Sequence, residues 1–257
     1  MLPINLALSL TNAWISWRVP AVAGLHSAVP VSWAEMARHR LFGHPQVLRA
    51  FAVQYLGGDT PSPPTPEWFD PVVENGRELP VWRLKVHSLP RAYAASQVVS
   101  APNDELALEW LASPQFVPER VAILSCGTAD GDIPGSAGCA IRWLRDSPDA
   151  ITIEVEARER AFLVVADHFF PGWKAELDGQ AATLHWANYM LRGVAVPSGR
   201  HTVRMTYRPE GWQLAVSLTR VGLWLWGLCA LGIAMWAARA WFTRHARALA
   251  SHGHALV

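Results

Sequence analysis

Residues 151–165 read ITIEVEARERAFLVV, and this stretch decides the fold class of the C-terminal half of the chain. Apolar and polar residues alternate over 151–157, which indicates a strand with one buried face. Residues 161–165 are apolar throughout, which is typical of a fully buried strand. The charged residues 158–160 lie between the two as a turn. We therefore predict a hairpin here.

Further strand-like segments follow this stretch, separated by turn residues. They cover 173–177, 182–186, 190–196 and 201–207, with turns at Asp178-Gly179 and Pro197-Ser-Gly199. An Asp-Gly pair between strands favours a type I′ turn. Short strands with turns every eight to twelve residues or so predict an antiparallel β-sandwich domain over residues 148–209.

The residues before the sandwich combine helical and strand patterns, so we expect a mixed α+β N-terminal part. Residues 1–59 are predicted to be a mixed helical and loop segment, with helices near 32–40 and 45–55. The sequence TPSPPTP at 60–66 cannot form a helix and marks a linker. An α+β segment then runs over 60–147, with strands at 79–84 and 91–99 and a helix at 103–111.

The chain ends in a run of residues long and apolar enough to span a membrane. Val221 to Ala238 is uncharged, and its 18 residues cover about 27 Å as a helix, close to the ~30 Å hydrocarbon thickness. The apolar character extends back towards Trp212, so we predict one transmembrane helix over 213–238, with tryptophans near both ends. A buried core helix is the alternative, although core helices are rarely apolar on every face.

The charges that flank this helix predict its orientation. Arg239, Arg244 and Arg247 follow the span, which places a basic tail, residues 239–257, in the cytoplasm and residues 1–210 outside it. The first ten residues, MLPINLALSL, lack the basic start of an export signal. Without an export signal, the residues before the span would normally stay in the cytoplasm, opposite to the orientation that the flanking charges predict. The simplest explanation of this conflict is that this sequence is the end of a longer, multi-spanning protein.

Composition excludes several classes of protein. The 257 residues are 51% hydrophobic and 17% charged, which argues against intrinsic disorder. Twenty-two basic and 21 acidic residues leave a formal charge of +1, which disfavours nucleic-acid binding. The three cysteines form no C-x-x-C pair, and we expect neither a metal nor another cofactor.

Two of the cysteines could form a disulfide. Cys126 and Cys139 flank a glycine-rich loop, and outside the cytoplasm they could be bridged across it. The alternative is two half-buried thiols. Cys229 lies inside the predicted span and is expected to be an ordinary membrane residue.

A set of motifs in fixed order carries a family resemblance. The segment DHFFPGWKAELDG at 167–179 is followed by Ala187-Asn-Tyr189, Arg192-Gly-Val194, Val196-Pro-Ser-Gly-Arg-His201 and Tyr207-Arg-Pro209. This pattern resembles the C-terminal part of YfhO-type bacterial membrane proteins, where it closes the extracytoplasmic region before the last membrane helix. The motif residues are Pro171, Gly172, Trp173, Gly179, Asn188, Gly199, His201, Tyr207 and Pro209. A weaker, collinear likeness includes residues 89–93.

The resemblance implies a membrane protein of the glycosyltransferase-C type in the bacterial inner membrane. Such a protein is suspected of moving sugars from a lipid carrier onto envelope polymers or lipids. The family's N-terminal membrane helices and early acidic residues have no counterpart here, so we expect no catalytic residues in this chain. The implied role is a membrane-tethered accessory or binding domain. Alternatives are the acceptor-binding half of a split glycosyltransferase and a non-functional fragment. Expected partners are the bilayer, an envelope glycan or lipid-linked sugar, and a multi-spanning membrane protein.

A few residues are candidates for ligand binding. Trp173 could stack on a sugar ring, with Asp167, His168 and Asp178 bonding its hydroxyls, or it could pack under the sandwich beside an Asp-Gly turn. Asp167 and His168 are neighbours on a strand, so their side chains should point to opposite faces, which argues against one shared catalytic site. Two further candidates, Arg91 and Arg192, could brace the fold by ion pairs or meet an anionic glycan phosphate.

Overall fold

The stretch 151–165 forms two strands, β9 (Ala150–Ala157) and β10 (Ala161–His168), which do not pair with each other. β9 pairs with β8 and β15, whereas β10 pairs with β5 and β14. The predicted hairpin is therefore wrong. Apolar side chains of both strands, such as Ile153 and Leu163, lie in one core. The turn between the strands connects two facing sheets rather than two neighbours within one sheet.

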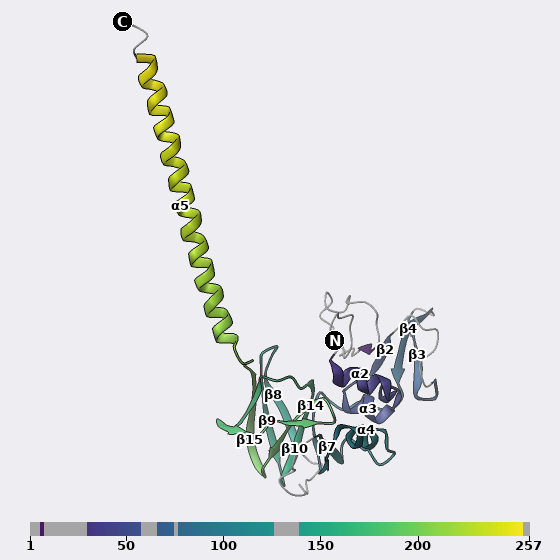
Figure 1. Cartoon of the computed structure of the whole chain (residues 1–257). Coiled ribbons are helices and arrows are strands. Elements are labelled where there is room, and N and C mark those ends of the chain that lie inside the picture. Colours follow the sequence, from purple (N-terminus) through teal and green to yellow (C-terminus); the bar gives the residue numbers. More distant parts are fainter. Residues whose placement is uncertain (1–5, 8–29, 58–65, 75–76, 126–138, 254–257) are drawn as a thin grey trace. The chain divides into compact units, whose positions relative to one another are not determined.

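The computed structural model describes residues 6–7, 30–57, 66–74, 77–125 and 139–253 (Figure 1). The chain divides into two units, Met1–Tyr207 and Arg208–Val257. Cys126 and most of the Pro-rich linker lie outside the described residues, so the disulfide and the linker stay predictions. Cys139 is half-buried at the start of β8.

Within the described residues, the strands of the first unit form sheets of four, six and five strands. The four-stranded sheet has the order β1 (Leu6–Ala7), β2 (Tyr55–Gly57), β4 (Arg77–Leu84), β3 (Phe69–Glu74). The six-stranded sheet has the order β5 (Ala92–Ala95), β10, β14 (Leu191–Val196), β13 (His185–Ala187), β7 (Val121–Ser125), β6 (Gln97–Ala101). The five-stranded sheet has the order β12 (Gln180–Ala182), β11 (Trp173–Leu177), β15 (Gly199–Tyr207), β9, β8 (Cys139–Ser147).

The six-stranded and five-stranded sheets pack face to face as a sandwich. The core between them contains side chains of β9, β10, β14 and β15, including Ile153, Leu163, Val194 and Met205, all at most 1% exposed. Strands β5, β6 and β7 come before residue 148, the predicted start of the sandwich. The sandwich therefore includes strands on both sides of that position in the sequence. Burial of alternate residues on facing strands explains the period-two pattern of the sequence.

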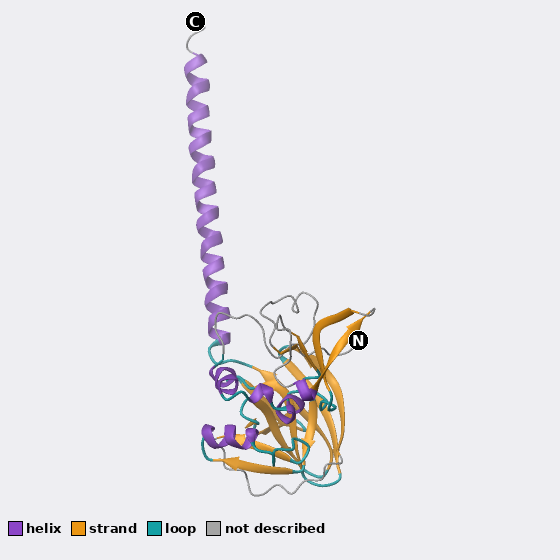
Figure 2. Ribbon diagram, turned by 90° about the vertical axis from the view of Figure 1, so that its right-hand side faces the viewer, coloured by secondary structure: helices purple, strands orange, loops and turns teal. Residues whose placement is uncertain are grey.

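The opposite face of the six-stranded sheet is also buried. There Phe162 and Val164 of β10 join a second core with residues of α2 (Val31–Arg38), α3 (Pro45–Ala50) and α4 (Asp104–Ala112). Two 3-10 turns, η1 (Leu41–Gly43) and η2 (Pro66–Trp68), complete this part. Figure 1 shows the three helices grouped together, away from β9 and β15, and Figure 2 shows them in purple against the orange strands.

Packing is very close where β14 passes Phe162. A Cβ atom built on Gly193 would lie 2.4 Å from two ring atoms of Phe162, far inside van der Waals contact. Gly193 therefore lets the Phe162 ring lie directly on the β14 backbone. Any side chain at this position would force the ring or the strand to move.

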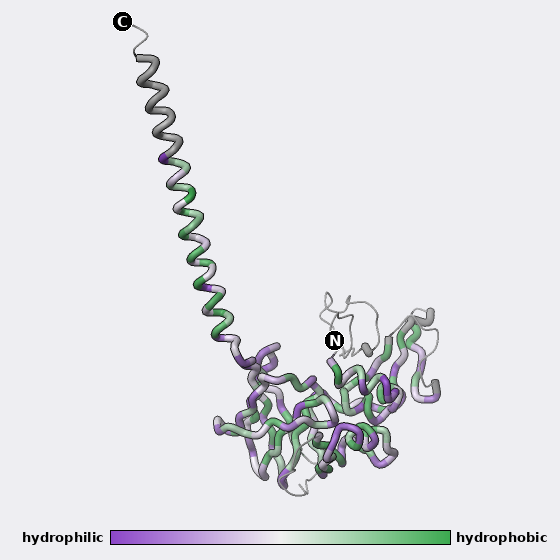
Figure 3. The backbone as a smooth tube through the Cα atoms, in the orientation of Figure 1, coloured by the Kyte–Doolittle hydropathy of each residue, from purple (hydrophilic) through white to green (hydrophobic). Residues whose placement is uncertain are grey.

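The second unit is dominated by helix α5 (Trp212–Gly253). Its residues Trp212–Arg239 are long and apolar enough to cross a membrane: an 18-residue window within them has a mean hydropathy of 1.8, and none of that window is buried. Figure 3 shows apolar green along much of this segment. Its 28 residues cover about 42 Å at a helical rise of about 1.5 Å, which exceeds the hydrocarbon thickness of about 30 Å.

The predicted fold class is confirmed. The chain is β-rich, has a few short helices, and ends in one apolar helix that could span a membrane. The predicted strand 91–99 is two strands, β5 and β6, and the predicted strand 182–186 corresponds to the ends of β12 and β13. The helix predicted at 103–111 is α4, with Asn103 as its N-cap: the Asn103 side chain accepts the backbone N–H of Leu106.

Candidate functional site

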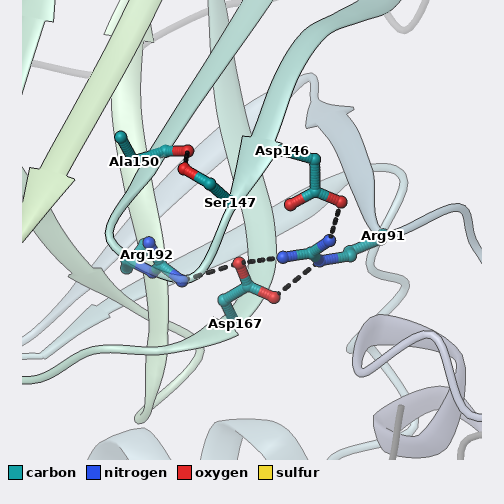
Figure 4. Close-up of polar contacts among 6 residues, drawn as sticks. All are labelled: Arg91, Asp146, Ser147, Ala150, Asp167 and Arg192. Atoms are coloured by element: carbon teal, nitrogen blue, oxygen red, sulfur yellow. Dashed lines mark hydrogen bonds and ion pairs between the residues drawn. The ribbon is translucent and has the colours of Figure 1, made fainter. Parts of the chain in front are cut away.

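Two arginines and two aspartates that are far apart in the sequence meet at one end of the sandwich (Figure 4). The Arg91 guanidinium donates Nε and Nη2 to the two oxygens of Asp167, at 2.7 and 2.8 Å, and Nη1 to Asp146 at 2.7 Å. Arg192 donates Nη2 to Asp167 at 2.6 Å. We call these four residues the arginine–aspartate cluster. Asp167 is its centre, because it accepts from both arginines.

The sheet register brings these side chains together. Arg192 is paired with Val165 on β10, and the pairing then shifts so that His168 lies opposite Leu191. Asp167 lies within this irregular part of β10, two residues after Val165, so the two side chains point to the same face of the sheet. Arg91 immediately precedes β5, the other neighbour of β10, and its carbonyl accepts the N–H of Ala166 at 2.7 Å. The cluster therefore follows from strand order within the six-stranded sheet, to which β8 adds Asp146.

Arg192 is the most buried ion of the cluster, with a side chain only 5% exposed. Burial lowers the pKa of Arg192 to about 10, against the opposing charge of Asp167, and the group stays cationic at neutral pH. Its guanidinium carbon lies 3.9 Å from the centre of the Trp173 ring, a cation–π contact. Among the described residues, Nε and Nη1 have no hydrogen-bond partner, so Asp167 and the ring carry its stabilisation.

Arg91 is more exposed, and its pKa moves the other way. Burial acts to lower the pKa of Arg91, but the hydrogen bonds and charges of Asp167 and Asp146 outweigh it and raise the value. The guanidinium carbon lies 4.8 Å from the centre of the Trp143 ring. Both arginines therefore use a carboxylate and a tryptophan, and the cluster has no net charge.

Trp173 begins β11 after a tight turn. Its N–H bonds to the carbonyl of Phe170 at 3.3 Å, with Pro171 and Gly172 between them, and Gly172 has φ +104°. This is the residue pattern of a type II turn. Trp173 packs against the sandwich core, and its ring lies 5.5 Å from that of Tyr207. The Trp173 ring is therefore in contact with both Tyr207 and Arg192.

Asp178 and His201 form a separate contact at the β11–β12 turn. Asp178 and Gly179 both have positive φ, as a type I′ turn requires. Asp178 accepts the Thr202 backbone N–H at 2.7 Å and the His201 ring Nδ1 at 2.6 Å. The other ring nitrogen lies 3.1 Å from the Ser198 carbonyl. Because both partners of the ring are acceptors, the geometry favours the doubly protonated imidazolium.

Asn188 lies between β13 and β14 and is fully buried. Its side chain accepts the N–H of Ile123 on β7 and donates to the Tyr93 hydroxyl of β5, each at 2.9 Å. Asn188 and Tyr189 both have positive φ, a conformation that Asn tolerates better than most residues. Asn188 thus ties the connection to two other strands of the six-stranded sheet.

A pocket of about 230 Å³ opens beside the end of β10. We call it the aromatic pocket, because four of its residues have aromatic rings besides His168. Its lining is Pro30, Val31, Ser32, Asp104, His168, Phe169, Phe170, Pro171, Trp186 and Tyr189. The rings of Phe169 and Trp186 are stacked with centres 5.3 Å apart, and Trp186 is 40% exposed.

His168 contributes a polar edge to the aromatic pocket. Its Nε2 lies 3.0 Å from the hydroxyl oxygen of Ser32, the second residue of α2. Burial, together with the nearby charge of Arg192, lowers the pKa of His168, so the imidazole is neutral at pH 7. It can therefore donate with one nitrogen and accept with the other.

The family comparison identifies the region that builds most of this geometry. Residues 147–219 match the family model described as bacterial membrane protein YfhO. This segment is YfhO-like. It runs from the last residue of β8 into α5, and so joins the sandwich to the apolar helix. The chain has no match among curated proteins or among solved structures.

The YfhO likeness of residues 147–219, together with the apolar helix, supports association with a membrane. Of the residues predicted to bind ligand, Asp167 and Arg192 meet in the arginine–aspartate cluster beside Trp173, whereas Asp178 lies with His201 and only His168 lines the aromatic pocket. Their ligand-binding role stays a prediction. Across the residues that are described, no group of His, Cys, Asp or Glu could hold a metal ion.

Sequence reasoning missed Ser32, Asp104, Phe169, Trp186 and Tyr189 as pocket residues. Their positions are separated by long stretches of chain, and Ser32 and His168 are 136 residues apart. The one local signal was aromatic: Phe169 and Tyr189 lie within or beside the motifs that carry the family resemblance.

Replacing Asp167 with Asn should destabilise the protein by about 3 kcal/mol, because the buried Arg192 would lose its carboxylate. Denaturant unfolding followed by tryptophan fluorescence measures this loss. The control is Glu156→Gln, which removes the partner of the exposed Arg200 and should cost much less, because solvent screens an exposed ion pair. Similar small losses for both variants would show that Arg192 does not depend on Asp167.

The Asp178–His201 contact should make stability depend on pH. The hydrogen bonds to Asp178 and Ser198 raise the pKa of His201 above its ordinary 6.5. The protonated His201 therefore stabilises the fold fully below pH 6.5, and this stabilisation is lost as pH rises through the raised pKa. The hydrogen bonds from His201 and Thr202 lower the pKa of Asp178 below its ordinary 3.8. The ionised Asp178 therefore stabilises the fold above pH 3.8, and this stabilisation is lost only as pH falls through the lowered pKa.

His201→Gln should therefore flatten the decline in unfolding free energy as pH rises from 6.5, because glutamine does not titrate. Unfolding curves of both proteins across this range provide the comparison. An unchanged slope would mean that His201 keeps its ordinary pKa in the folded protein.

Proposed function

We propose that this chain is a membrane-anchored, YfhO-like binding module that holds a saccharide in its aromatic pocket. The saccharide would belong to an envelope glycan or to a lipid-linked sugar. The bonds of the glycosylation reaction would be made by catalytic residues outside this chain, in a multi-spanning membrane partner. The observation that carries this proposal is the composition of the aromatic pocket, in which stacked rings lie beside hydroxyl, imidazole and carboxylate groups.

This combination suits the chemistry of sugars. A pyranose ring has apolar C–H faces, which pack on aromatic rings, and a rim of hydroxyls, which need donors and acceptors. Trp186 offers a partly exposed indole, stacked on Phe169. Ser32, Asp104 and His168 supply polar groups around it. A volume of about 230 Å³ suits a small ligand such as one sugar residue, since larger ligand pockets run from about 300 Å³ upward.

The arginine–aspartate cluster has a different part in the proposal. Its two carboxylates already balance the charges of both arginines, so it offers little free positive charge to a glycan phosphate. We assign it the bracing role. By holding the end of β10, it positions the following residues, His168 to Pro171, in the wall of the pocket.

The proposal places the N-terminal unit outside the bacterial inner membrane and the basic tail in the cytoplasm. Arginines after the span favour this orientation. In sealed cells that carry a C-terminal epitope, added protease should digest the residues before Trp212 and spare the epitope. Protection of the N-terminal unit instead would overturn the orientation, and with it the access to external glycans.

Saccharide binding should depend on Trp186. With the detergent-solubilised chain, saturation-transfer NMR against glucose, glucosamine and N-acetylglucosamine should detect binding of at least one sugar. Trp186→Leu should weaken it about fivefold, since an aromatic contact contributes about 1 kcal/mol. Tyr207→Leu, at an equally exposed aromatic residue outside the pocket, should leave binding unchanged. Absence of binding by all three sugars would refute the proposed function.

A further inference from the structure

Only a short piece of chain connects the sandwich to the apolar helix. Tyr207 is the last residue of β15, and α5 starts at Trp212. These five residue steps cover at most about 18 Å of extended chain. The apolar segment of α5 is longer than the hydrocarbon layer, so its ends reach the interfacial regions when it spans a bilayer. The covalent chain therefore keeps the Tyr207 end of the sandwich close to the membrane surface.

Two turns lie beside Tyr207 at this end of the sandwich. The N–H of Tyr207 bonds to the carbonyl of Asp149 at 2.8 Å, in the turn 147–150 between β8 and β9. Trp173 is paired with Tyr207 in the sheet and follows the turn that begins at Phe170. We call the turns 147–150 and 170–173, together with Tyr207, the anchor-side rim.

Two aromatic side chains of the anchor-side rim are exposed. Phe170 and Tyr207 keep 44% and 40% of their surface accessible. The Phe170 ring meets that of His168 edge-on at 4.2 Å, and the Tyr207 ring lies 5.5 Å from that of Trp173. Each ring is thus held on one side and open on another. Exposed apolar rings are unfavourable in water, whereas aromatic side chains are favoured at the interface between membrane and water.

The exposed charges next to these rings are mixed. Lys174 and Arg208 each follow a residue of the rim, and the acids Asp149 and Glu210 lie close to them in the chain. Basic side chains can lay their apolar stems along a membrane surface while their charged ends stay in water. With two acids beside two bases, charge gives little preference for an anionic surface. The rings therefore indicate the partner, and it is the bilayer interface whatever its headgroup charge.

The opposite end of the sandwich is polar. There Ala157 of β9 is paired with Gly199 of β15, and the turns are 158–160 and 197–199. The first consists of three exposed charged residues, and the second has the sequence Pro-Ser-Gly. Neither turn contains a large apolar side chain. The two ends thus differ in the property that a membrane interface selects.

We propose that the anchor-side rim docks on the surface of the bilayer that α5 spans, with the Phe170 and Tyr207 rings at the level of the lipid headgroups. Docking is reversible and non-covalent. It adds a second attachment to the one made by α5 and limits the rotation of the sandwich about residues 208–211. This inference goes beyond the proposed function and does not depend on saccharide binding.

Photolabelling of lipid from the two ends of β9 tests the proposal. The full chain is placed in phosphatidylcholine nanodiscs with a photoreactive residue at one exposed acid, either Asp149→p-benzoylphenylalanine at the rim or Glu159→p-benzoylphenylalanine at the opposite end. The eight residues of β9 separate these positions by about 27 Å. Crosslinking to lipid should be strong at 149 and close to background at 159. Equal crosslinking, or more at 159, would overturn the proposal.

Variants of the rim assign the docking to its rings. With the reporter at 149, Phe170→Ser should lower crosslinking at least about fivefold, because the exposed ring area would no longer be removed from water. Tyr207→Ser should act in the same direction, and Phe170→Trp should keep crosslinking high. The control is Val73→Ser, at an exposed apolar residue of β3, which should change nothing. Melting temperatures report whether each variant is folded. Crosslinking that persists in both folded serine variants would show that the rings do not hold the rim.

Lipid composition separates the insertion of rings from attraction by charge. Crosslinking at 149 should be equally strong in nanodiscs of phosphatidylcholine and in nanodiscs that also contain phosphatidylglycerol. If it occurred only with phosphatidylglycerol, basic side chains rather than aromatic rings would hold the rim at the membrane, and the proposal would be wrong.

Discussion

The burial of strand β10 on both faces is the constraint on which the rest of the structure depends. Leu163 and Val165 pack between the two sheets of the sandwich, and Phe162 and Val164 pack towards the helices. The same alternation continues past the apolar run. Asp167 contacts the arginines, whereas His168 reaches Ser32 on α2, as expected for neighbours on a strand. One strand thus supplies the brace and part of the pocket wall.

The ion pairs show how the sandwich is held at this end. Asp146 belongs to the five-stranded sheet, whereas Asp167 and Arg192 belong to the six-stranded sheet, and Arg91 bonds to both aspartates. The arginines therefore connect the two sheets where apolar packing gives way to polar side chains. Burying the charge of Arg192 there costs free energy, and the contacts with Asp167 and the Trp173 ring offset this cost.

Local patterns predicted the elements well and their partners poorly. Alternation in 151–157 and the Asp178-Gly179 turn depend on neighbouring residues, so the sequence displays them directly. Which strand lies beside β10 depends on β5 and β14, and no local signal encodes that choice. The predicted hairpin was wrong for this reason. A period-two pattern shows which face of a strand is buried, but it does not show which strand or sheet covers that face.

The close approach of Gly193 to Phe162 links two positions that are 31 residues apart in the chain. A larger residue at 193 fits only if the ring at 162 becomes smaller, and a smaller residue at 162 opens a cavity unless 193 grows. The two sites can therefore change only as a pair. Sequences that share this sandwich should show the exchange as coupled variation, with glycine at 193 where 162 is aromatic and a larger side chain where it is not.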